Sequence, residues 1–455
     1  MTKTFRALLG VTSALCLLAL GGLAHAAVTA QQAAQLKTTL TPFGAERAGN
    51  ADGSIPAWTG GYTTVPPGFK SGDVLPDVYG ADKPILIITA ANAAQYQDKL
   101  PAGVMTLFHK YPDYRVEVYP THRSAAAPQY VYDNTFENAT RASGENDDLT
   151  VTGAYGGIPF PIPQSGRQVM WNSELRWLGY SVRINGGQYM RTASGDLVES
   201  SLTIANLLYP YYDPNGSVAT FKGIEQYLEA TIYDPPYNSG QANLRIYPLD
   251  QYDHSVEVYE YLTGQRRVRK APSLTYDTPN FFSSGIGQFD EFRGFDGALD
   301  RYTFTIVGKK EMYIPYNCNK WANTVQSQKM LAHYANPDAV RWELHRVWVI
   351  DAKLAPGKRN VVAERHIYVD EDTWAVVASD EYDAQGNDWR LILELPMVVP
   401  DLPGTLTIAG LIYDFQVGDY ADNFDIDSSS RPQYQTVQMP ASNFTPAGLA
   451  SAGVE

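Results

Sequence analysis

The second half of the chain alternates polar and apolar residues in short runs that are rich in β-branched and aromatic side chains. This pattern is typical of half-buried β-strands, in which successive side chains point to opposite faces of a sheet. Clusters of Gly, Pro, Asp and Asn separate the runs and predict tight turns. The predicted strands are residues 256–261, 301–307, 342–350, 366–369, 374–377 and 389–393. Short strands joined by such turns indicate a mainly β fold with some helices, built on a large antiparallel curved sheet or open barrel.

Helical patterns are fewer and shorter. They cover residues 28–40, 92–99, 102–110, 171–177 and 322–332. Residues 41–83 are rich in Pro and Gly and predict an irregular, turn-dominated segment. Because no linker of Gly/Ser or charged residues divides the chain, residues 27–420 are expected to form a single β-rich domain. The polar residues 421–455 predict an extended C-terminal tail.

The first residues have the pattern of a cleaved export signal. Two positively charged residues precede an apolar run, 7–23, which closes on small residues at Ala24 and Ala26. Residues 1–26 are therefore expected to be removed, and the protein is expected to work in the periplasm. The alternative, a membrane anchor, requires about 20 continuous apolar residues, whereas Thr, Ser and Gly interrupt this run. No other segment predicts a membrane span.

Acidic residues outnumber basic ones, 49 to 35, and the formal net charge is −14. Such a charge disfavours nucleic acid as a partner. The histidines lack the spacing of metal ligands, and neither H-E-x-x-H nor G-x-S-x-G occurs, so the sequence predicts no metal, no cofactor and no catalytic site. Cys16 would leave with the signal, so Cys318 is expected to be a buried small hydrophobe without a disulfide partner.

One concentrated basic patch lies in this acidic chain, at Arg266, Arg267 and Arg269. Guanidinium groups bind phosphates and carboxylates bidentately, so the patch is a candidate docking site for an anionic head group or an acidic partner surface. The alternative is a strand whose arginines pair with neighbouring acids and add little stability.

One face of the longest predicted strand combines two tryptophans, two aliphatic residues and one arginine: Trp342, Leu344, Arg346, Trp348 and Ile350. It predicts a cavity wall that binds a hydrophobic or amphipathic ligand, with one polar group to orient it. The alternative is ordinary core with the arginine in a buried ion pair. The 31 tyrosines suit amphipathic ligands and stacked sugars equally well, so carbohydrate binding stays open.

Several segments are distinctive when taken together, among them Pro159-Phe-Pro-Ile-Pro163 and Tyr368-Val-Asp-Glu-Asp-Thr-Trp374. The others are residues 40–50, 55–61, 264–272, 309–317 and 341–349. They resemble an uncharacterised family of proteobacterial periplasmic proteins known as LolB-like or outer-membrane-lipoprotein-sorting proteins. The resemblance covers nearly the whole chain after the signal.

This resemblance implies a half-open β-barrel wrapped around helices, as in the lipoprotein carriers LolA and LolB. It also implies two partners, an inner-membrane transporter of the resistance-nodulation-division type and an outer-membrane protein. It assigns no catalytic residues.

The sequence therefore predicts a periplasmic, non-enzymatic carrier or chaperone of a hydrophobic or amphipathic molecule, working between an inner-membrane exporter and the outer membrane. Two alternatives remain at this point. The first is a docking or scaffold protein of an envelope transport complex, and the second is a secreted hydrolase or carbohydrate-binding protein.

The export signal makes a direct prediction. Protein recovered from the periplasm should begin at Ala27 and carry no acyl group, because Leu15 before Cys16 does not fit a lipidation site. Intact-mass measurement checks this, and a mass that retains residues 1–26 or includes an acyl chain would contradict it.

Overall fold

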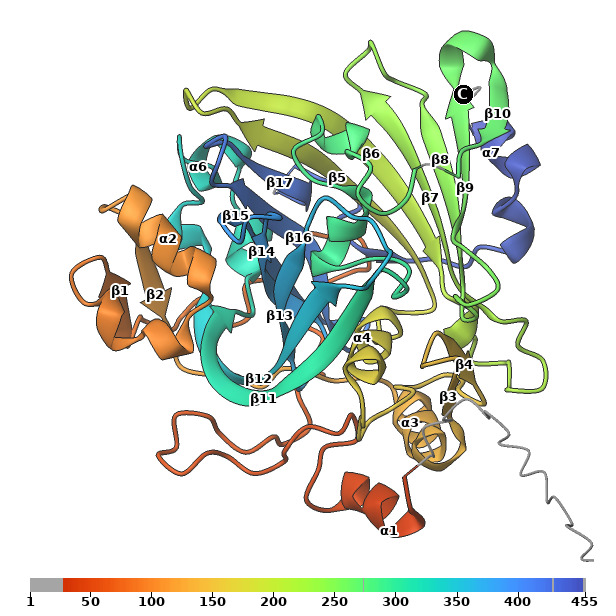
Figure 1. Ribbon diagram of the computed structural model, residues 1–455, viewed down its shortest axis with the longest axis horizontal. Helices are drawn as coiled ribbons and strands as arrows, with labels where there is room; N and C mark the ends of the chain where they lie inside the picture. Colours follow the sequence, from red (N-terminus) through yellow and green to blue (C-terminus); the bar gives the residue numbers. More distant parts are fainter. Residues whose placement is uncertain (1–27, 273, 428, 453–455) are drawn as a thin grey trace, which may run out of the picture.

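The computed structural model describes residues 28–272, 274–427 and 429–452, which form one large, strongly curved β-sheet (Figure 1). Its 16 strands follow the order β1-β2-β12-β13-β14-β15-β16-β17-β5-β6-β7-β8-β9-β10, with β11 beside β12 and β18 beside β5. Only β2 and β12 meet in a parallel pair, and every other neighbouring pair is antiparallel. The predicted fold class is confirmed: the protein is mainly β, with few helices and a large curved sheet that does not close into a barrel.

The strands are β1 (Leu86–Thr89), β2 (Arg115–Val118), β3 (Ser143–Glu145), β4 (Thr150–Thr152), β5 (Ser181–Arg191), β6 (Leu197–Leu208), β7 (Ile224–Asp234), β8 (Ala242–Pro248), β9 (Glu257–Leu262), β10 (Arg267–Lys270), β11 (Tyr302–Pro315), β12 (Trp342–Leu354), β13 (Glu364–Asp370), β14 (Val376–Tyr382), β15 (Asp388–Val399), β16 (Gly404–Asp414), β17 (Tyr420–Asp425) and β18 (Gln435–Thr436).

The α-helices are α1 (Ala30–Ala33), α2 (Ala102–Lys110), α3 (Gln129–Arg141), α4 (Gly166–Glu174), α5 (Asn319–Ala322), α6 (Gln326–Lys329) and α7 (Pro446–Ala452). The 3-10 helices are η1 (Ala34–Lys37), η2 (Ala93–Gln95), η3 (Gln97–Lys99), η4 (Pro210–Tyr212), η5 (Thr263–Gln265), η6 (Phe281–Ser283), η7 (Phe289–Gly294), η8 (Pro337–Ala339) and η9 (Ala441–Asn443).

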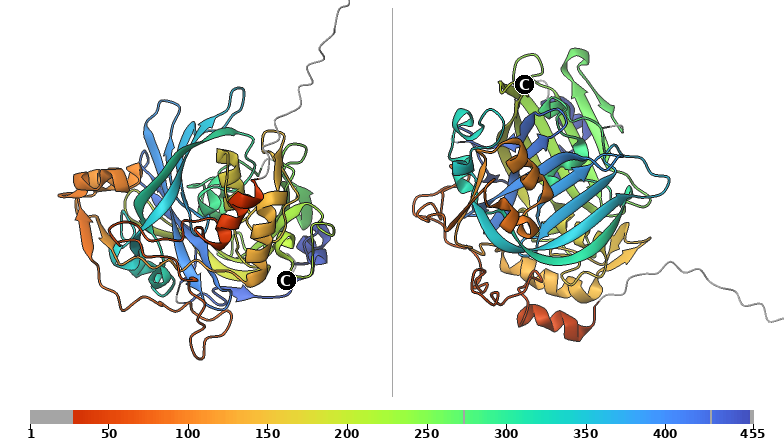
Figure 2. Two further views of the ribbon diagram at one scale, coloured as in Figure 1. Left: turned by 90° about the horizontal axis from the view of Figure 1, so that it is seen from below. Right: turned by 60° about the vertical axis from the view of Figure 1, so that its left-hand side comes forward.

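Two antiparallel meanders make up most of the sheet. One runs from β12 to β17 and the other from β5 to β10, and the pairing of β17 with β5 joins them. Among the described residues β10 and β11 do not pair with each other, so the sheet stays open on one side. Figure 2 shows the curved sheet from two further directions.

The two sides of the sheet are covered differently. On the concave side η7 contacts β14, β15 and β16, while η6 contacts β5 and β6. On the other side α7 contacts β8, β9 and β10 (Figure 1). Leu449 of α7 is buried there in a small apolar cluster with Leu244 and Tyr261.

Several predicted helices form with altered limits. The helix predicted at 102–110 is α2, but 92–99 forms only the short turns η2 and η3, and 322–332 is divided between α5 and α6. Helix α4 begins before its predicted start because Ser165 caps it, its hydroxyl accepting from the amide of Gln168 at 3.1 Å.

Helix α3 was not predicted, since its sequence is rich in Asn and Thr, which favour helix interiors weakly. Contacts with the following segment hold it instead. Asn138 donates from Nδ2 to the carbonyl of Gly157 at 2.9 Å, and Thr135 Oγ1 accepts from the amide of Ile158 at 2.9 Å. Tertiary hydrogen bonds therefore outweigh local propensity here.

The C-terminal region differs from the expected tail. Residues 420–425 form β17 in the middle of the sheet, and 446–452 form α7. The sequence reads as polar because β17 carries Asp422 and Asp425, yet both side chains are buried and accept from the indole Nε1 of Trp321, at 3.0 and 2.8 Å. Paired acids can occupy a central strand, which a hydropathy pattern does not reveal.

The segment 41–83 contains no helix or strand among the described residues and lies against the turn between β13 and β14. Trp374, at the end of that turn, is fully buried and donates from its indole to the carbonyl of Phe43 at 2.8 Å. The backbone amide of Glu46 donates to Glu371 Oε1 at 3.1 Å. The N-terminal segment thus covers one end of the sheet.

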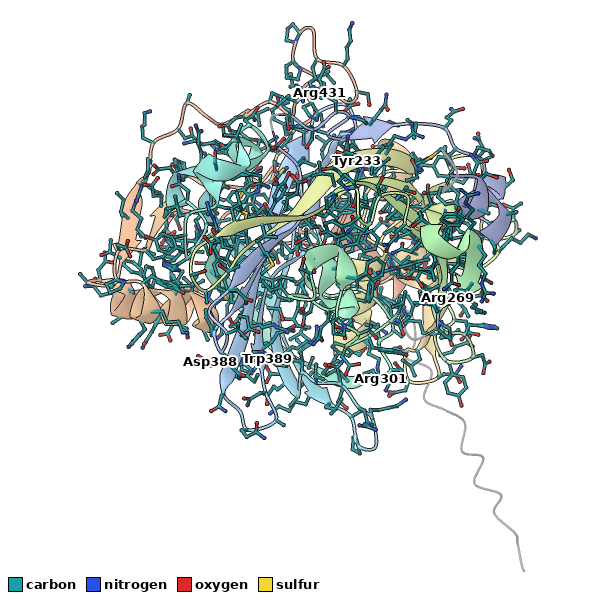
Figure 3. The ribbon with its side chains drawn as sticks, turned by 90° about the horizontal axis from the view of Figure 1, so that it is seen from above. Tyr233, Arg269, Arg301, Asp388, Trp389 and Arg431 are labelled. Atoms are coloured by element: carbon teal, nitrogen blue, oxygen red, sulfur yellow. The ribbon has the colours of Figure 1, made fainter. Side chains whose placement is uncertain are left out.

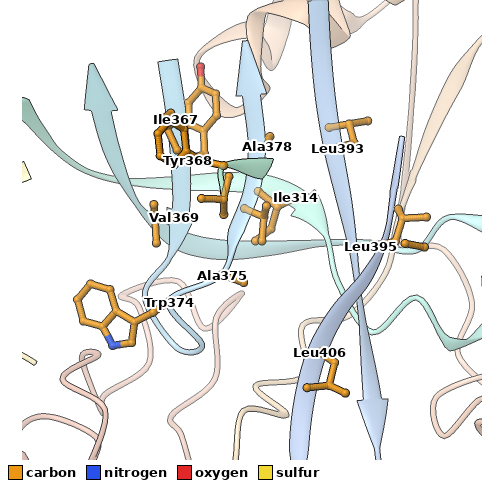
Figure 4. Close-up of a cluster of buried hydrophobic side chains, with 14 of the residues drawn as sticks. Ile314, Ile367, Tyr368, Val369, Trp374, Ala375, Ala378, Leu393, Leu395 and Leu406 are labelled. Carbon is orange, nitrogen blue, oxygen red and sulfur yellow. The ribbon is translucent and has the colours of Figure 1, made fainter. Parts of the chain in front are cut away.

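The main hydrophobic core includes residues of both meanders and of the elements that pack against them, and Figure 4 shows part of it. Figure 4 labels Ile314, Ile367, Tyr368, Val369, Trp374, Ala375, Ala378, Leu393, Leu395 and Leu406. Within the described part of the chain, no helix combines the length and apolar character that a bilayer crossing requires. The predicted export signal lies outside the described residues.

Cys318 makes a testable prediction about this core. Its side chain is fully buried and its Sγ donates to the carbonyl of Arg341 at 3.4 Å. Burial raises the pKa of the thiol to about 12. The native protein should therefore not react with an aromatic disulfide reagent at pH 8, whereas urea-unfolded protein should react fully. Cys318→Ala should cost about 1–2 kcal/mol of unfolding free energy, measured by urea denaturation. Rapid labelling of the native thiol would contradict this prediction.

Candidate functional site

The five residues predicted to line a cavity do lie together on β12, but other elements cover them. Trp342, Leu344 and Ile350 are buried, and Ile350 is directly opposite Ile306 of β11 and Ile367 of β13. Neighbouring strands and side chains fill the space around them.

The polar member of this group pairs with acids. Arg346 lies 3.6 Å from Glu46 and 3.6 Å from Glu371, and donates to the carbonyl of Ala48 at 3.1 Å. Trp348 is half-buried. None of the five residues lines the apolar pocket described below, and a ligand-binding role for them stays a prediction.

The predicted basic patch lies at β10, an edge of the sheet, and Figure 3 shows Arg269 near the outer rim of the molecule. Arg269 donates from Nε and Nη2 to Glu260 Oε2 at 3.0 and 2.8 Å. Arg266 and Arg267 are exposed and form no ion pair within the described part of the chain. A docking role of this patch stays a prediction.

An apolar pocket lies elsewhere, on the concave face of strands β5 to β8. Its cavity volume is about 70 Å³. The apolar lining consists of Leu178, Val182, Ile184, Ala205, Leu207, Leu228, Ala230, Phe282, Phe292, Leu406 and Phe424.

Strand register explains why space remains at this point. Side chains on one face of a sheet lie side by side across neighbouring strands. One such row runs from Ile184 of β5 through Ala205 of β6 and Ala230 of β7 to Asn243 of β8. Two alanines in the middle of this row leave room that larger residues would fill. A Cβ on Gly186, the next inward position of β5, would lie 2.6 Å from the carbonyl of Asp425, so only glycine fits beside β17.

The other wall comes from the segment that crosses the concave side. Phe282 belongs to η6 and Phe292 to η7, while Phe424 belongs to β17. The rings of Phe292 and Phe424 meet edge to face, with centroids 6.3 Å apart. Removing this cover would open the pocket to the hollow of the half-open sheet.

Polar atoms without partners converge on the pocket. Five of its lining residues each have a buried side-chain atom that lacks a hydrogen bond among the described residues: Gln188 Oε1, Thr203 Oγ1, Asn243 Oδ1, Arg245 Nε and Arg293 Nε. Native proteins pair the large majority of such atoms with protein or ordered water. A concentration of them in one pocket marks a place where water or a polar group of a ligand completes the hydrogen bonding.

Two arginines share one aspartate at this polar end. Arg293 donates from Nη2 to Asp296 Oδ1 at 2.8 Å, and Arg245 Nη1 lies 3.7 Å from Asp296 Oδ2. The guanidinium group of Arg245 also lies over the ring of Phe289, 4.3 Å from its centroid. Two positive charges face one negative charge, so this part of the pocket favours an anionic group.

Nearby carboxyl groups do not cancel this excess. Burial raises the pKa of Glu225 to about 8 and that of Glu394 to about 8, and it raises the pKa of Glu174 well above its usual range. All three are buried, so desolvation penalises their charged forms. Their raised pKa values favour the protonated forms, so these groups offset the positive charge of the two arginines less than ordinary carboxylates would.

Sequence reasoning missed every residue of this pocket, although a signal was present. In β5, Val182 and Ile184 alternate with Arg183 and Asn185, and only the first two are buried. This is the same two-residue period that identified the later strands. The pair of glycines at 186–187 interrupts the pattern and is typical of a turn rather than a strand interior.

The sequence model of a family described as "Protein of unknown function (DUF1329)" matches residues 87–450. The chain belongs to this family. All strands of the pocket lie within the part that matches the DUF1329 model. An uncharacterised protein of Pseudomonas aeruginosa is 36% identical over 460 residues, which cover 99% of this chain and 100% of that protein.

Solved structures with lower similarity also align with this DUF1329 protein. A domain of an outer membrane lipoprotein-sorting protein from Vibrio parahaemolyticus has 12% identity and a TM-score of 0.43, over 62% of this chain and 97% of that one. A DUF1329 family protein from Desulfovibrio piger has 11% identity and a TM-score of 0.42, over 62% and 97%. A LolA superfamily protein from Nitrosomonas europaea has 9% identity and a TM-score of 0.36, over 62% and 98%.

The buried acids predict how stability depends on pH. An acid with a raised pKa binds its proton more tightly in the folded state, so its stabilising contribution is complete below about pH 4.5 and is lost as the pH rises through about 8. Glu394→Gln removes this dependence at one site. Its unfolding free energy should therefore fall less than that of the wild type between pH 5 and pH 9, by a few kcal/mol at most.

Urea midpoints across this pH range measure the effect. Glu137→Gln, on the exposed side of α3, is the control and should follow the wild-type profile. If the urea midpoints of the wild type and of Glu394→Gln change with pH in the same way, Glu394 is already ionised at neutral pH.

Proposed function

We propose that the protein is a non-enzymatic carrier of an anionic amphiphile in the cell envelope, and that the pocket on β5 to β8 binds the ligand. The observation that carries this proposal is the pocket itself, in which an apolar wall ends at five unpaired polar atoms. A molecule with a hydrocarbon part and a polar head matches both halves of that surface.

The wall supplies the binding energy and the arginines supply the orientation. Burial of apolar ligand surface contributes about 25 cal/mol per Å². Arg245 and Arg293 keep unpaired Nε–H donors and a net positive charge, which favour a carboxylate or phosphate. Two guanidinium groups around one anion give direction as well as affinity.

The cavity volume of about 70 Å³ accommodates only a few heavy atoms. Loading of a long chain therefore requires part of the cover to move away from the sheet. Buried ion pairs of Arg390 with Glu291 and of Arg365 with Asp290, at 2.6 and 3.1 Å, anchor η7 to the sheet. The η6 part has fewer side-chain hydrogen bonds to the sheet, such as that from Ser201 Oγ to the carbonyl of Phe282 at 3.0 Å. We propose that ligand entry displaces the η6 part.

We propose the compartment and the partners on two grounds, the predicted export signal and the family resemblance. The predicted export signal directs the chain to the periplasm, and the family resemblance favours exchange between an inner-membrane exporter of the resistance-nodulation-division type and an outer-membrane protein. The exposed Arg266 and Arg267 at the β10 edge are the proposed contact with an acidic partner surface or with head groups.

Filling the pocket should abolish binding. Ala230→Leu places three additional carbons in the row between β6 and β8, and should lower the affinity for a dansyl-labelled fatty acid at least tenfold, measured by fluorescence titration. Thr231→Leu is the matched control, because the next residue of β7 points to the opposite face. Equal affinity of wild type and Ala230→Leu, both folded by circular dichroism, would place the ligand elsewhere.

Two further variants distinguish ligand binding in the pocket on β5 to β8 from ligand binding on the β12 face. Arg245→Gln should weaken binding of the labelled fatty acid about tenfold, the usual effect of losing a hydrogen bond to a charged group, and should leave its methyl ester unaffected. Trp348→Ala should retain binding, because Trp348 does not line this pocket. Loss of binding in Trp348→Ala with an unchanged urea midpoint would instead support the β12 face.

A further inference from the structure

Three side chains meet at the end of the β13–β14 hairpin, on the opposite half of the sheet from the pocket. His345 lies on β12, Asp370 is the last residue of β13, and Asp372 lies in the turn that follows. All three are buried, with exposed fractions of 1%, 0% and 3%. Strand pairing fixes their positions, because β12 and β13 are direct neighbours.

Their ligand atoms point toward a common centre. His345 Nδ1 lies 4.0 Å from Asp370 Oδ1 and 3.9 Å from Asp372 Oδ2. All three atoms lie within 4.8 Å of one another. These separations are too long for N–H···O hydrogen bonds, which span about 2.7–3.2 Å.

The hydrogen bonding of His345 fixes which nitrogen faces the centre. Its Nε2 lies 3.1 Å from Glu343 Oε2. Glu343 also accepts from Arg341 Nε at 2.5 Å, Asn317 Nδ2 at 2.9 Å and the amide of His122 at 2.8 Å, so it acts as an acceptor toward His345 as well. Nε2 therefore carries a proton, and Nδ1 is the nitrogen that faces the two carboxylate oxygens. A carboxylate behind a histidine in this way is the usual outer-shell partner of a metal-binding imidazole.

Asp370 leaves one oxygen free. Its Oδ2 accepts from the amide and the hydroxyl of Thr373 at 2.9 and 2.6 Å, and the Tyr316 hydroxyl lies 3.4 Å away. Its Oδ1 has no hydrogen-bond partner among the described residues. The unpaired atom is the one that faces His345.

The local charge leaves room for a cation. Arg123 pairs with Asp372, donating from Nε to Oδ2 at 2.8 Å and from Nη2 to Oδ1 at 2.6 Å. Arg341 pairs with Glu343. One carboxylate, Asp370, then remains without a cationic partner within salt-bridge range other than the His345 imidazole. With a neutral imidazole, the lone pair of His345 Nδ1 and the Asp370 and Asp372 oxygens repel one another, and a cation at their centre relieves this repulsion.

From this geometry we infer that His345 Nδ1, Asp370 Oδ1 and Asp372 Oδ2 bind a divalent metal ion. Two sides of the triangle are 4.0 and 3.9 Å and the third is at most 4.8 Å. An equidistant ion would lie roughly 2.3–2.5 Å from each corner, so a small inward shift of the side chains gives the bond lengths of zinc to nitrogen and oxygen. One imidazole and two carboxylates favour Zn²⁺ or Mn²⁺ over Ca²⁺, which prefers oxygen ligands alone.

The ion would fasten the N-terminal segment to the sheet. Arg123, which holds Asp372, also donates from Nη2 to the carbonyl of Glu46 at 2.7 Å. Trp374, two residues after Asp372, donates to the carbonyl of Phe43. The site is therefore structural, and it stands independently of ligand binding in the pocket on β5 to β8.

A second trio of similar composition provides an internal control. Asp351, Glu364 and His366 also place ligand atoms within 4.8 Å of one another, farther along the same two strands, near the end of β12 and the start of β13. Their side chains are about one-third exposed, and Glu364 already pairs with Lys353 at 3.1 Å and with His366 at 3.2 Å. Exposed, paired acids of this kind are common without a metal, so Asp351→Asn should not alter metal content.

The test uses the full periplasmic protein, stripped with EDTA and then incubated with ZnCl₂, MnCl₂ or CaCl₂. Plasma mass spectrometry should find about one equivalent of zinc or manganese after desalting, and each of these ions should raise the Tm of the stripped protein by several degrees. The Asp370→Asn variant should bind less than a tenth as much zinc or manganese as the wild type, because its side-chain amide can donate to His345 Nδ1 in place of the ion. Asp351→Asn should match the wild type.

Two results would overturn the inference. If the wild-type protein binds no zinc or manganese and its Tm does not change, then a proton on Nδ1 of His345, rather than a metal ion, lies between the imidazole and the two carboxylates. Full metal content in folded Asp370→Asn would place the ion elsewhere. If Asp370→Asn does not fold, anomalous diffraction from zinc-soaked wild-type crystals decides, because the inference requires a peak among the three ligand atoms.

Discussion

The pairing of β17 with β5 is the contact on which the rest of the structure depends. It joins two meanders that are separate in sequence into one sheet, and the curvature of that sheet creates the concave side. The strand achieves this while burying two acids. Lys329 is fully buried and its ammonium donates to Asp425, which also accepts from the indole of Trp321. Because a buried charge without a partner costs several kcal/mol, this cluster allows only one register of β17.

The pocket is a second consequence of the same geometry. A sheet that curves this strongly cannot bring its own faces into contact everywhere, so a separate segment, η6 and η7, packs against the concave side. Where small residues such as Ala205 and Ala230 face that segment, the packing is incomplete. Most buried polar atoms in native proteins are paired, and five of the atoms that are not paired here belong to residues that line this one pocket. Incomplete packing and incomplete hydrogen bonding at one point distinguish a binding site from ordinary core.

How far the sequence predicted the structure depended on what its periodicity could reveal. Strands β9, β11, β12, β13 and β15 begin within a residue or two of their predicted starts, because alternation and flanking turns both identify them. Strand β14 begins later than predicted, since Trp374 occupies a left-handed conformation with φ of 62° and belongs to the preceding turn. Strands β1, β2, β5 to β8, β10, β16 and β17 were not predicted. For β5 and β17 the reason is that paired glycines and buried acids resemble loops.

The candidate sites were harder to predict for a different reason. Alternation along β12 identified which side chains share a face, but not which element covers that face. The N-terminal segment does so, and it reaches β12 through contacts such as that of Arg346 with Ala48, nearly three hundred residues away in the sequence. No local pattern encodes such a contact. The same holds for His345 and Asp370, which are brought together only by the register of β12 and β13.

The long separation between β5 and β17 also constrains how the chain folds. Gly187 and Asp425 pair across the sheet although more than two hundred residues lie between them. Proteins with many such non-local pairings fold slowly, since the entropy of closing a long loop is lost before the pairing stabilises the structure. The β5–β10 meander cannot acquire its neighbour until nearly the whole polypeptide is available to fold. The edge of β5 thus remains exposed until late in folding, and the concave wall that includes Phe424 is among the last parts of the protein to assemble.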